Sequence, residues 1–229
     1  MTTALDEVLD RLDTAARQAR QPQPRLLAVS KFQPATAIAQ LAALGQRAFG
    51  ENYVQEAAGK RAELTRLDLE WHLIGHLQTN KAREAAMLFD WVQTVDRPRI
   101  VDALGRHRPN DLPPLQVLIQ VNVDDEASKH GCAPEDVEAL AARIHGHERL
   151  VLRGLMAIPT PHPDPEQRRP AFARMHGLFD ALRGHHPAVD TLSMGMSDDC
   201  AVAISEGATM VRIGTALFGA RPPRPADRA

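Results

Sequence analysis

The chain has 229 residues, of which 44% are hydrophobic and 24% are charged, and its formal net charge is −2. These values are typical of a globular protein and give no electrostatic reason to expect nucleic acid or an acidic membrane as a partner. The first twenty residues contain acids and no long apolar core, and no later apolar run is long enough to cross a bilayer. We therefore expect neither a signal peptide nor a membrane anchor.

The spacing of the cysteines and histidines bears on the cellular compartment and on metal binding. Cys132 and Cys200 are far apart and have no CxxC spacing, so two free thiols in a reducing cytoplasm are the simplest interpretation. The ten histidines include no HExxH or comparable ligand set. The sequence therefore predicts a cytoplasmic protein without a metal site.

A helix is predicted over residues 1–20, where apolar residues recur at helical spacing from Leu5 to Ala19. The QPQPR segment ends it, because two prolines cannot continue a helix. From residue 26 the pattern alternates between short apolar runs and amphipathic segments. The eight expected strands are 26–30, 47–51, 70–75, 91–95, 115–123, 151–158, 191–194 and 210–214.

Helical patterns separate these strands, and one of them is expected to begin at Ser197. Repeated βα units imply parallel strands, and eight units favour closure into a single (β/α)8 TIM-type barrel. An open doubly wound sheet is the alternative. No linker divides the chain, so we expect one domain over 1–229, with an N-terminal helix (1–20), a barrel (26–219) and a tail (220–229).

Lys31 follows the first strand directly, at the end of the RLLAVSK segment. In a parallel barrel this end of a strand faces the crevice in which ligands bind. Burial disfavours the ammonium form and produces a nucleophilic amine suited to Schiff-base chemistry. The alternative is a lysine that extends from the strand end into water.

Other polar residues follow the remaining strands. The residues expected at the same face of the barrel are Glu51, Asn52, His72, Gly75, His76, Asn80, Asn122, Lys129, Met156, Pro159, Met194, Gly195, Ser197, Arg212, Gly214 and Thr215.

Two segments of this face resemble a phosphate site. SMGMS (193–197) places a glycine and a serine in a strand-to-helix turn, and RIGT (212–215) adds a second glycine and hydroxyl. Against a phosphate site, Asp198 and Asp199 follow directly and would repel an anion unless they point away. The alternative is that Ser197 is only a helix N-cap.

Arg212 lies between Val211 and Ile213 on an apolar strand. It could form a structural ion pair inside the barrel, or donate to the ring or acid group of a ligand. A Schiff-base lysine, a phosphate cradle and an inward arginine together suggest pyridoxal 5′-phosphate (PLP). Schiff-base aldolases that act on phosphorylated sugars combine the same three features.

Seven motifs, found in order between residues 26 and 219, carry a resemblance to a known family. They are LLAVSK, FGENYVQE, WHLIGHLQTNK, VNVDDEASKHG, RGLMAIP, SMGMSDD and VRIGTALFG. The chain resembles the YggS/PROSC family of pyridoxal phosphate homeostasis proteins.

The resemblance implies an alanine-racemase-like barrel with PLP bound as an aldimine to Lys31. It implies that Ser197, Gly214 and Thr215 hold the phosphate and that Arg212 faces the pyridine nitrogen. It further implies that Asn52, His72 and Met194 line the cofactor. The family is regarded as a carrier or regulator of PLP without robust catalysis, with PLP-dependent apo-enzymes as candidate recipients.

Several features bear on that carrier role. The chain ends about ten residues after Gly219, so we expect no second domain, and Tyr53 is the only tyrosine. Some relatives have a second lysine two residues after the first, where this chain has Gln33. Lys129 matches the family pattern and is a candidate second cofactor-handling lysine, with a solvated loop lysine as the simpler interpretation.

Three functions compete at this stage: a PLP carrier, a PLP-dependent racemase or decarboxylase, and a cofactor-free Schiff-base aldolase. We expect a monomer, because no long apolar surface stripe is left over. The polar loop 159–170 has no role that the sequence identifies.

Overall fold

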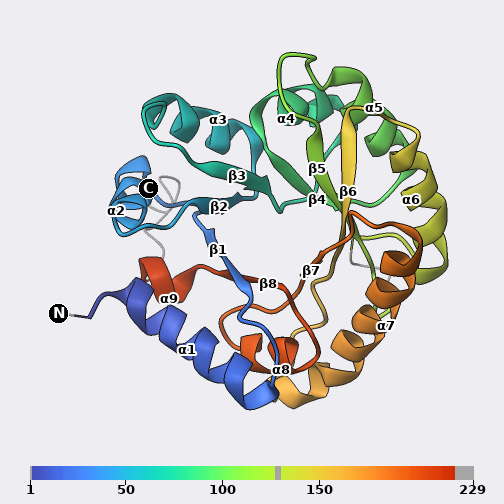
Figure 1. Ribbon diagram of the computed structural model, residues 1–229. Helices are drawn as coiled ribbons and strands as arrows, with labels where there is room; N and C mark the ends of the chain where they lie inside the picture. The colour runs from blue at the N-terminus through green and yellow to red at the C-terminus, as the bar shows by residue number, and fades with distance from the viewer. Residues whose placement is uncertain (1, 127–129, 220–229) are drawn as a thin grey trace, which may run out of the picture.

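The computed structural model describes residues 2–126 and 130–219. Eight parallel strands form a closed barrel in chain order, and β1 pairs with β8 as well as with β2 (Figure 1). The strands are β1 Arg25–Val29, β2 Ala48–Glu51, β3 Glu70–Leu73, β4 Trp91–Val95, β5 Leu115–Gln120, β6 Leu150–Met156, β7 Thr191–Ser193 and β8 Met210–Ile213. The predicted TIM-type barrel is confirmed, and the open doubly wound sheet is excluded by the β1–β8 pairing.

Helices surround the barrel (Figure 1). The α-helices are α1 Ala4–Ala19, α2 Ala35–Ala43, α3 Val54–Glu63, α4 Ala82–Leu88, α5 Pro98–His107, α6 Val137–His145, α7 Arg169–His185, α8 Cys200–Ser205 and α9 Thr215–Phe218. The short 3-10 helices in the described part of the chain are η1 Thr79–Lys81, η2 Pro134–Asp136 and η3 Pro165–Arg168. Within the described residues, no helix combines the length and apolarity needed to span a membrane.

The N-terminal helix α1 packs against α8 and α9. A capping box starts it, in which the Thr3 hydroxyl accepts from the Asp6 backbone N–H and the Asp6 carboxylate accepts from the Thr3 backbone N–H. Leu5, Val8 and Leu12 bury the apolar stripe that the sequence shows. The extra helix therefore belongs to the outer layer.

Several strands end before the predicted boundary. β5 ends at Gln120 rather than at 123, and β6 ends at Met156 rather than at 158. Beyond these points the chain stays apolar but enters the loops at the carboxyl end of the barrel. Apolarity reports burial and not pairing, so the sequence predicted strands that are too long at this end.

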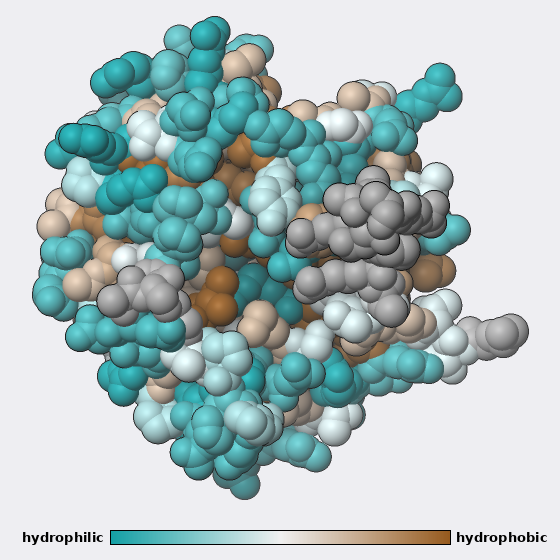
Figure 2. All heavy atoms as spheres, turned by 180° about the vertical axis from the view of Figure 1, so that it is seen from behind, coloured by the Kyte–Doolittle hydropathy of each residue, from teal (hydrophilic) through white to brown (hydrophobic). Residues whose placement is uncertain are grey.

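The barrel interior contains both apolar and polar side chains. Leu27, Ala48, Ile74 and Met210 form one cluster, and Trp91, Leu118 and Met156 form another, whereas the larger core packs the helices. Seen from the back, hydrophobic side chains show in the middle of the molecule and hydrophilic ones cover most of the periphery (Figure 2). Cys132 and Cys200 are free thiols, as predicted, and both are buried.

Candidate functional site

Predicted site residues gather on one arc of the barrel. Lys31 and Asn52 follow β1 and β2, Ser197 follows β7, and Gly214 and Thr215 follow β8. In the closed barrel β7, β8, β1 and β2 are consecutive neighbours. These residues therefore share the carboxyl-end face, where (β/α)8 barrels place their ligands.

The loop that carries Lys31 is held on both sides. On one side, the Ser30 hydroxyl donates to the Glu51 carboxylate at 2.5 Å, and its carbonyl accepts from Lys60 Nζ at 2.7 Å. On the other side, the backbone N–H of Phe32 donates to Glu56 Oε1 at 2.5 Å. Phe32 has a φ of 65°, a conformation that a bulky residue adopts only where its surroundings enforce it. The backbone on both sides of Lys31 is thus held in place, and its side chain is half-buried.

A buried charge cluster underlies this loop. Lys60 Nζ lies 2.7 Å from Glu51 Oε1 and 2.6 Å from Glu56 Oε1. The Glu51 side chain is fully buried, and burial raises its pKa, although Lys60 and Ser30 oppose that rise. Lys60 was not among the predicted site residues, because a lysine within a helix gives no signal of its partners.

Asn52 is positioned by the close approach of two strand ends. A Cβ added to Gly75 would lie 2.1 Å from the carbonyl oxygen of Asn52, so only glycine fits there. The backbone N–H of Ile74 donates to the Glu51 carbonyl at 2.9 Å. These contacts hold the ends of β2 and β3 together and leave the Asn52 side chain half-buried at the face.

The turn after β7 is a compact loop built around Gly195. This glycine has a φ of 91°, and a Cβ there would lie 2.6 Å from the Cβ of Ala203 in α8. Its carbonyl accepts from the backbone N–H of Arg212 at 3.0 Å, which joins the SMGMS and RIGT segments. Ser197 lies in this turn and is half-buried.

The expected helix start at Ser197 is wrong. Helix α8 begins at Cys200, and its N-cap residue is Asp199. The Asp199 carboxylate accepts from the backbone N–H of Met196 at 2.6 Å, which keeps the intervening residues in a turn. Ser197 is therefore not a helix N-cap, and its side chain has no capping role.

The two acids next to Ser197 do not act alike. Asp199 is 1% exposed, and Arg168 Nη1 donates to its carboxylate at 2.5 Å. Asp198 is exposed to solvent. Arg168 comes from η3 at the end of the polar loop 159–170, so this loop supplies the cation that compensates Asp199. The objection to an anion site is thereby weakened, since one acid is neutralised and the other lies on the surface.

Arg212 lies inside the barrel and is 4% exposed. Its guanidinium donates to three neutral oxygens, the Ser193 carbonyl, the Ser193 hydroxyl and the Ala157 carbonyl, each at 2.8 Å. Within the described residues no carboxylate forms an ion pair with it, so the predicted structural ion pair is not found there. Burial lowers the pKa of Arg212 to about 10. A buried cation held by neutral groups is a candidate for ligand binding.

A chain of hydrogen bonds runs from Arg212 through the barrel interior. Ser193 Oγ donates to Gln93 Oε1 at 2.7 Å, and Gln93 Nε2 contacts His72 Nδ1 at 2.9 Å. His72 Nε2 contacts Glu70 at the amino end of β3. The Gln93 contact assigns Nδ1 as the acceptor, so Nε2 carries the proton. Burial lowers the pKa of His72, although its contact with Glu70 opposes that shift.

The other predicted residues lie in different surroundings. His72 is fully buried with both ring nitrogens engaged, and its ring stacks on Trp91 at 5.1 Å between centroids. The Met194 side chain is fully buried in the main hydrophobic core. Thr215 is exposed. Lys129 and the tail 220–229 lie outside the described residues.

Known proteins with the same fold identify the broad class to which this chain belongs. The profile of the alanine racemase N-terminal domain family matches residues 4–222. An alanine racemase from Clostridium difficile shares the fold, with a TM-score of 0.64 and 16% identity over 94% of this chain and 58% of its own. Eight parallel strands with a lysine after the first thus describe an alanine-racemase-like barrel.

Closer relatives narrow the class to one family. The pyridoxal phosphate homeostasis protein of Pseudomonas aeruginosa is 57% identical over 86% of this chain and 84% of its own. The Escherichia coli K12 protein of the same name is 50% identical over 95% of both chains. PipY of Synechococcus elongatus, solved with PLP bound, has a TM-score of 0.80 and 38% identity over 93% of this chain and 100% of its own. The chain therefore belongs to the pyridoxal phosphate homeostasis protein family, as its motifs predicted.

Proposed function

We propose that this protein binds PLP at the carboxyl-end face of its barrel, with Lys31 as the covalent anchor, and acts in PLP homeostasis as a carrier or regulator. The observation that carries the proposal is the buried guanidinium of Arg212, which has only neutral partners among the described residues. The relatives named for PLP homeostasis and the PLP-bound PipY structure support it.

The residues present fit PLP in three respects. PLP supplies an aldehyde that condenses reversibly with a primary amine, and Lys31 offers such an amine from a loop fixed on both sides. Arg212 offers a donor suited to a ring nitrogen. Ser197, Gly214 and Thr215 offer hydroxyl and backbone donors for the phosphate, beside a turn that only Gly195 can form.

The supporting residues have distinct tasks in this proposal. The Ser30, Glu51 and Lys60 cluster holds the backbone of Lys31 and thereby limits where its amine can reach. Ser193 and Gln93 orient the Arg212 guanidinium. His72 contributes through this chain, since both of its nitrogens are already engaged. Asn52 borders the site from β2.

A carrier fits the described residues better than a racemase or a decarboxylase. A racemase needs an acid or base on each face of the reacting carbon. Tyr53, the only tyrosine, is 50% exposed, and its ring contacts Phe32 at 5.7 Å between centroids. We therefore propose that the protein has no robust catalytic activity of its own, and that PLP-dependent apo-enzymes receive its cofactor.

The test is the visible spectrum of the purified protein loaded with PLP, before and after borohydride, with peptide mass analysis of the adduct. We expect a yellow protein that bleaches on reduction and carries the adduct on Lys31. Lys31→Ala should show neither, whereas Lys81→Ala, which removes a half-buried lysine paired with Glu84, should behave as wild type. A protein that cannot be loaded would refute the proposal. Trapping of a sugar phosphate but not PLP would identify an aldolase.

The carrier role has its own test. The loaded protein is incubated with single L-amino acids, and the products are separated by chirality. We expect no turnover with any of them. Turnover that Lys31→Ala abolishes would show an enzyme instead.

A further inference from the structure

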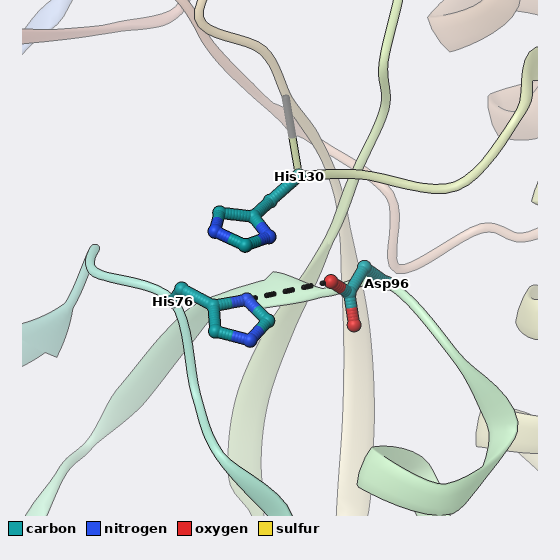
Figure 3. A group of neighbouring side chains, drawn as sticks. All are labelled: His76, Asp96 and His130. Carbon is teal, nitrogen blue, oxygen red and sulfur yellow. Dashed lines mark ion pairs between the residues drawn. The ribbon is translucent and has the colours of Figure 1, made fainter. Parts of the chain in front are cut away.

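Three potential metal ligands converge near the carboxyl ends of β3, β4 and β5. They are His76, Asp96 and His130, and their ligand atoms all lie within 4.8 Å of one another. Figure 3 shows the two imidazole rings face to face and the Asp96 carboxylate beside them. His76 and His130 are 54 positions apart in the chain, so the sequence, which predicted no metal site, gave no spacing that joins them.

Neighbouring groups hold the Asp96 carboxylate and the backbone of the two loops that carry the histidines. Arg97 Nη1 donates to Asp96 Oδ1 at 2.5 Å, and its Nη2 donates to the Leu77 carbonyl at 2.9 Å, in the loop that carries His76. The backbone carbonyl of His130 accepts from Gln120 Nε2 at 3.1 Å, and Gln120 is a buried β5 residue. Arg97 is thus a second partner that orients the Asp96 carboxylate, as such partners do at metal sites in proteins.

The cluster itself contains no hydrogen bond that would satisfy these side chains. The His76 Nδ1 to Asp96 Oδ2 distance is 3.7 Å, which is too long for one. The two rings stack, with 3.7 Å between centroids and 14° between planes, so neither nitrogen is aimed at the other ring. Among the described residues, neither imidazole has a hydrogen-bond partner.

The ligand set matches borderline divalent cations. Imidazole and carboxylate suit Zn²⁺ and its neighbours in the first transition row, and two histidines with one carboxylate recur at zinc sites. Ligand atoms around a tetrahedral Zn²⁺ lie about 3.3 Å apart, given Zn–N and Zn–O bonds of about 2.0–2.2 Å. His130 is exposed, and rotation about its χ2 bond can aim a nitrogen at the shared point.

We propose that His76, Asp96 and His130 form a binding site for one divalent first-row transition metal ion, such as Zn²⁺, with a further coordination position left to water. The site is built from β3, β4 and β5, whereas the residues proposed for PLP follow β7, β8, β1 and β2. The proposal therefore stands whether or not Lys31 binds PLP.

The test measures Zn²⁺ binding to the full chain by calorimetry and Co²⁺ binding by its visible absorption, both before PLP is added. The variants are His76→Ala, His130→Ala and Asp96→Asn, each checked for folding by circular dichroism. His185→Ala is the matched control, because this exposed histidine also lies near a carboxylate, 3.8 Å from Glu138, but outside the cluster.

We expect one ion per wild-type chain, and an affinity at least ~10-fold lower in each of the three variants, while His185→Ala keeps wild-type affinity. A wild-type chain that binds no Zn²⁺ would overturn the proposal. So would equal binding in all variants, a loss confined to one of the three ligand variants, or a loss in His185→Ala.

Discussion

The two ends of the barrel use charged residues in different ways. At the amino end the charges are paired. Arg25 Nη2 lies 2.7 Å from Glu70, and Arg153 pairs with Asp190 while its guanidinium lies 4.9 Å from the Trp91 ring centroid. Both pairs are partly accessible to solvent.

At the carboxyl end the buried Arg212 guanidinium is held by carbonyl and hydroxyl oxygens instead. A pair of opposite charges satisfies itself, whereas a buried cation with neutral partners keeps the capacity to bind an acceptor. Arg212 thus differs from the arginines of the amino end in having no carboxylate partner among the described residues, although other charges at the carboxyl end, such as Lys60 with Glu51 and Arg168 with Asp199, are paired.

The largest expected effect is on stability, at the buried Arg168–Asp199 pair near the carboxyl end of the barrel. Arg168→Met removes the partner of Asp199 and leaves a buried carboxylate uncompensated. We expect the free energy of unfolding to fall by about 3–5 kcal/mol, measured by urea denaturation. PLP binding should weaken as well, because the negative charge beside Ser197 is then exposed to the phosphate.

The control is Arg143→Met, which breaks a surface pair with Asp102 in which both side chains are solvent-accessible. We expect a loss of about 1 kcal/mol or less there. Equal losses in the two variants would mean that the Arg168 pair is no more buried in solution than a surface pair.

The second-largest expected effect is on the affinity for PLP and not on stability. Arg212→Met removes the buried guanidinium, and we expect PLP to be retained about ten- to hundredfold less tightly, since a charge-assisted hydrogen bond contributes about 1.5–3 kcal/mol. Arg153→Met, a similar change at the amino end, should leave PLP affinity unaltered. Dialysis of loaded protein against buffer measures both, and equal PLP loss would contradict the contrast between the two ends.

The smallest expected effect is a pH dependence of stability that arises from Glu70 at the amino end of the barrel. Burial alone would raise the pKa of Glu70, but hydrogen bonds from His72 and Arg25 and electrostatic attraction to them outweigh it and lower the pKa from 4.5 to about 2. In the unfolded chain Glu70 takes up a proton as the pH falls below 4.5, whereas in the folded chain it stays ionised until about pH 2. Glu70 therefore stabilises the fold above pH 4.5, and this contribution is lost as the pH falls toward 2.

The matching variant is Glu70→Gln, for which we expect a loss of about 1–2 kcal/mol at pH 7. The difference from wild type should shrink between pH 4.5 and pH 3, as followed by thermal unfolding at a series of pH values. A difference that stays constant over this range would show that the Glu70 carboxylate does not stabilise the fold through its charge.

The sequence by itself determined the barrel and the face at which its parallel strands end. Alternating apolar runs and helical segments are local patterns, and parallel strands must end at a common face, so Lys31, Ser197 and Arg212 were predicted there from the order of the chain alone. The family resemblance had the same source, because its motifs follow those strand ends.

Only the tertiary structure decided which charges are paired. Arg168 reaches Asp199 across 31 positions, Lys60 reaches the Ser30 carbonyl across 30, and His76 meets His130 across 54. Such contacts depend on how helices and loops pack around the closed barrel, and a side chain several bonds long can meet many partners from one position in the sequence. The start of α8 also depends on a side-chain contact. The Asp199 carboxylate holds the turn before the helix, so α8 begins at Cys200 and not at Ser197.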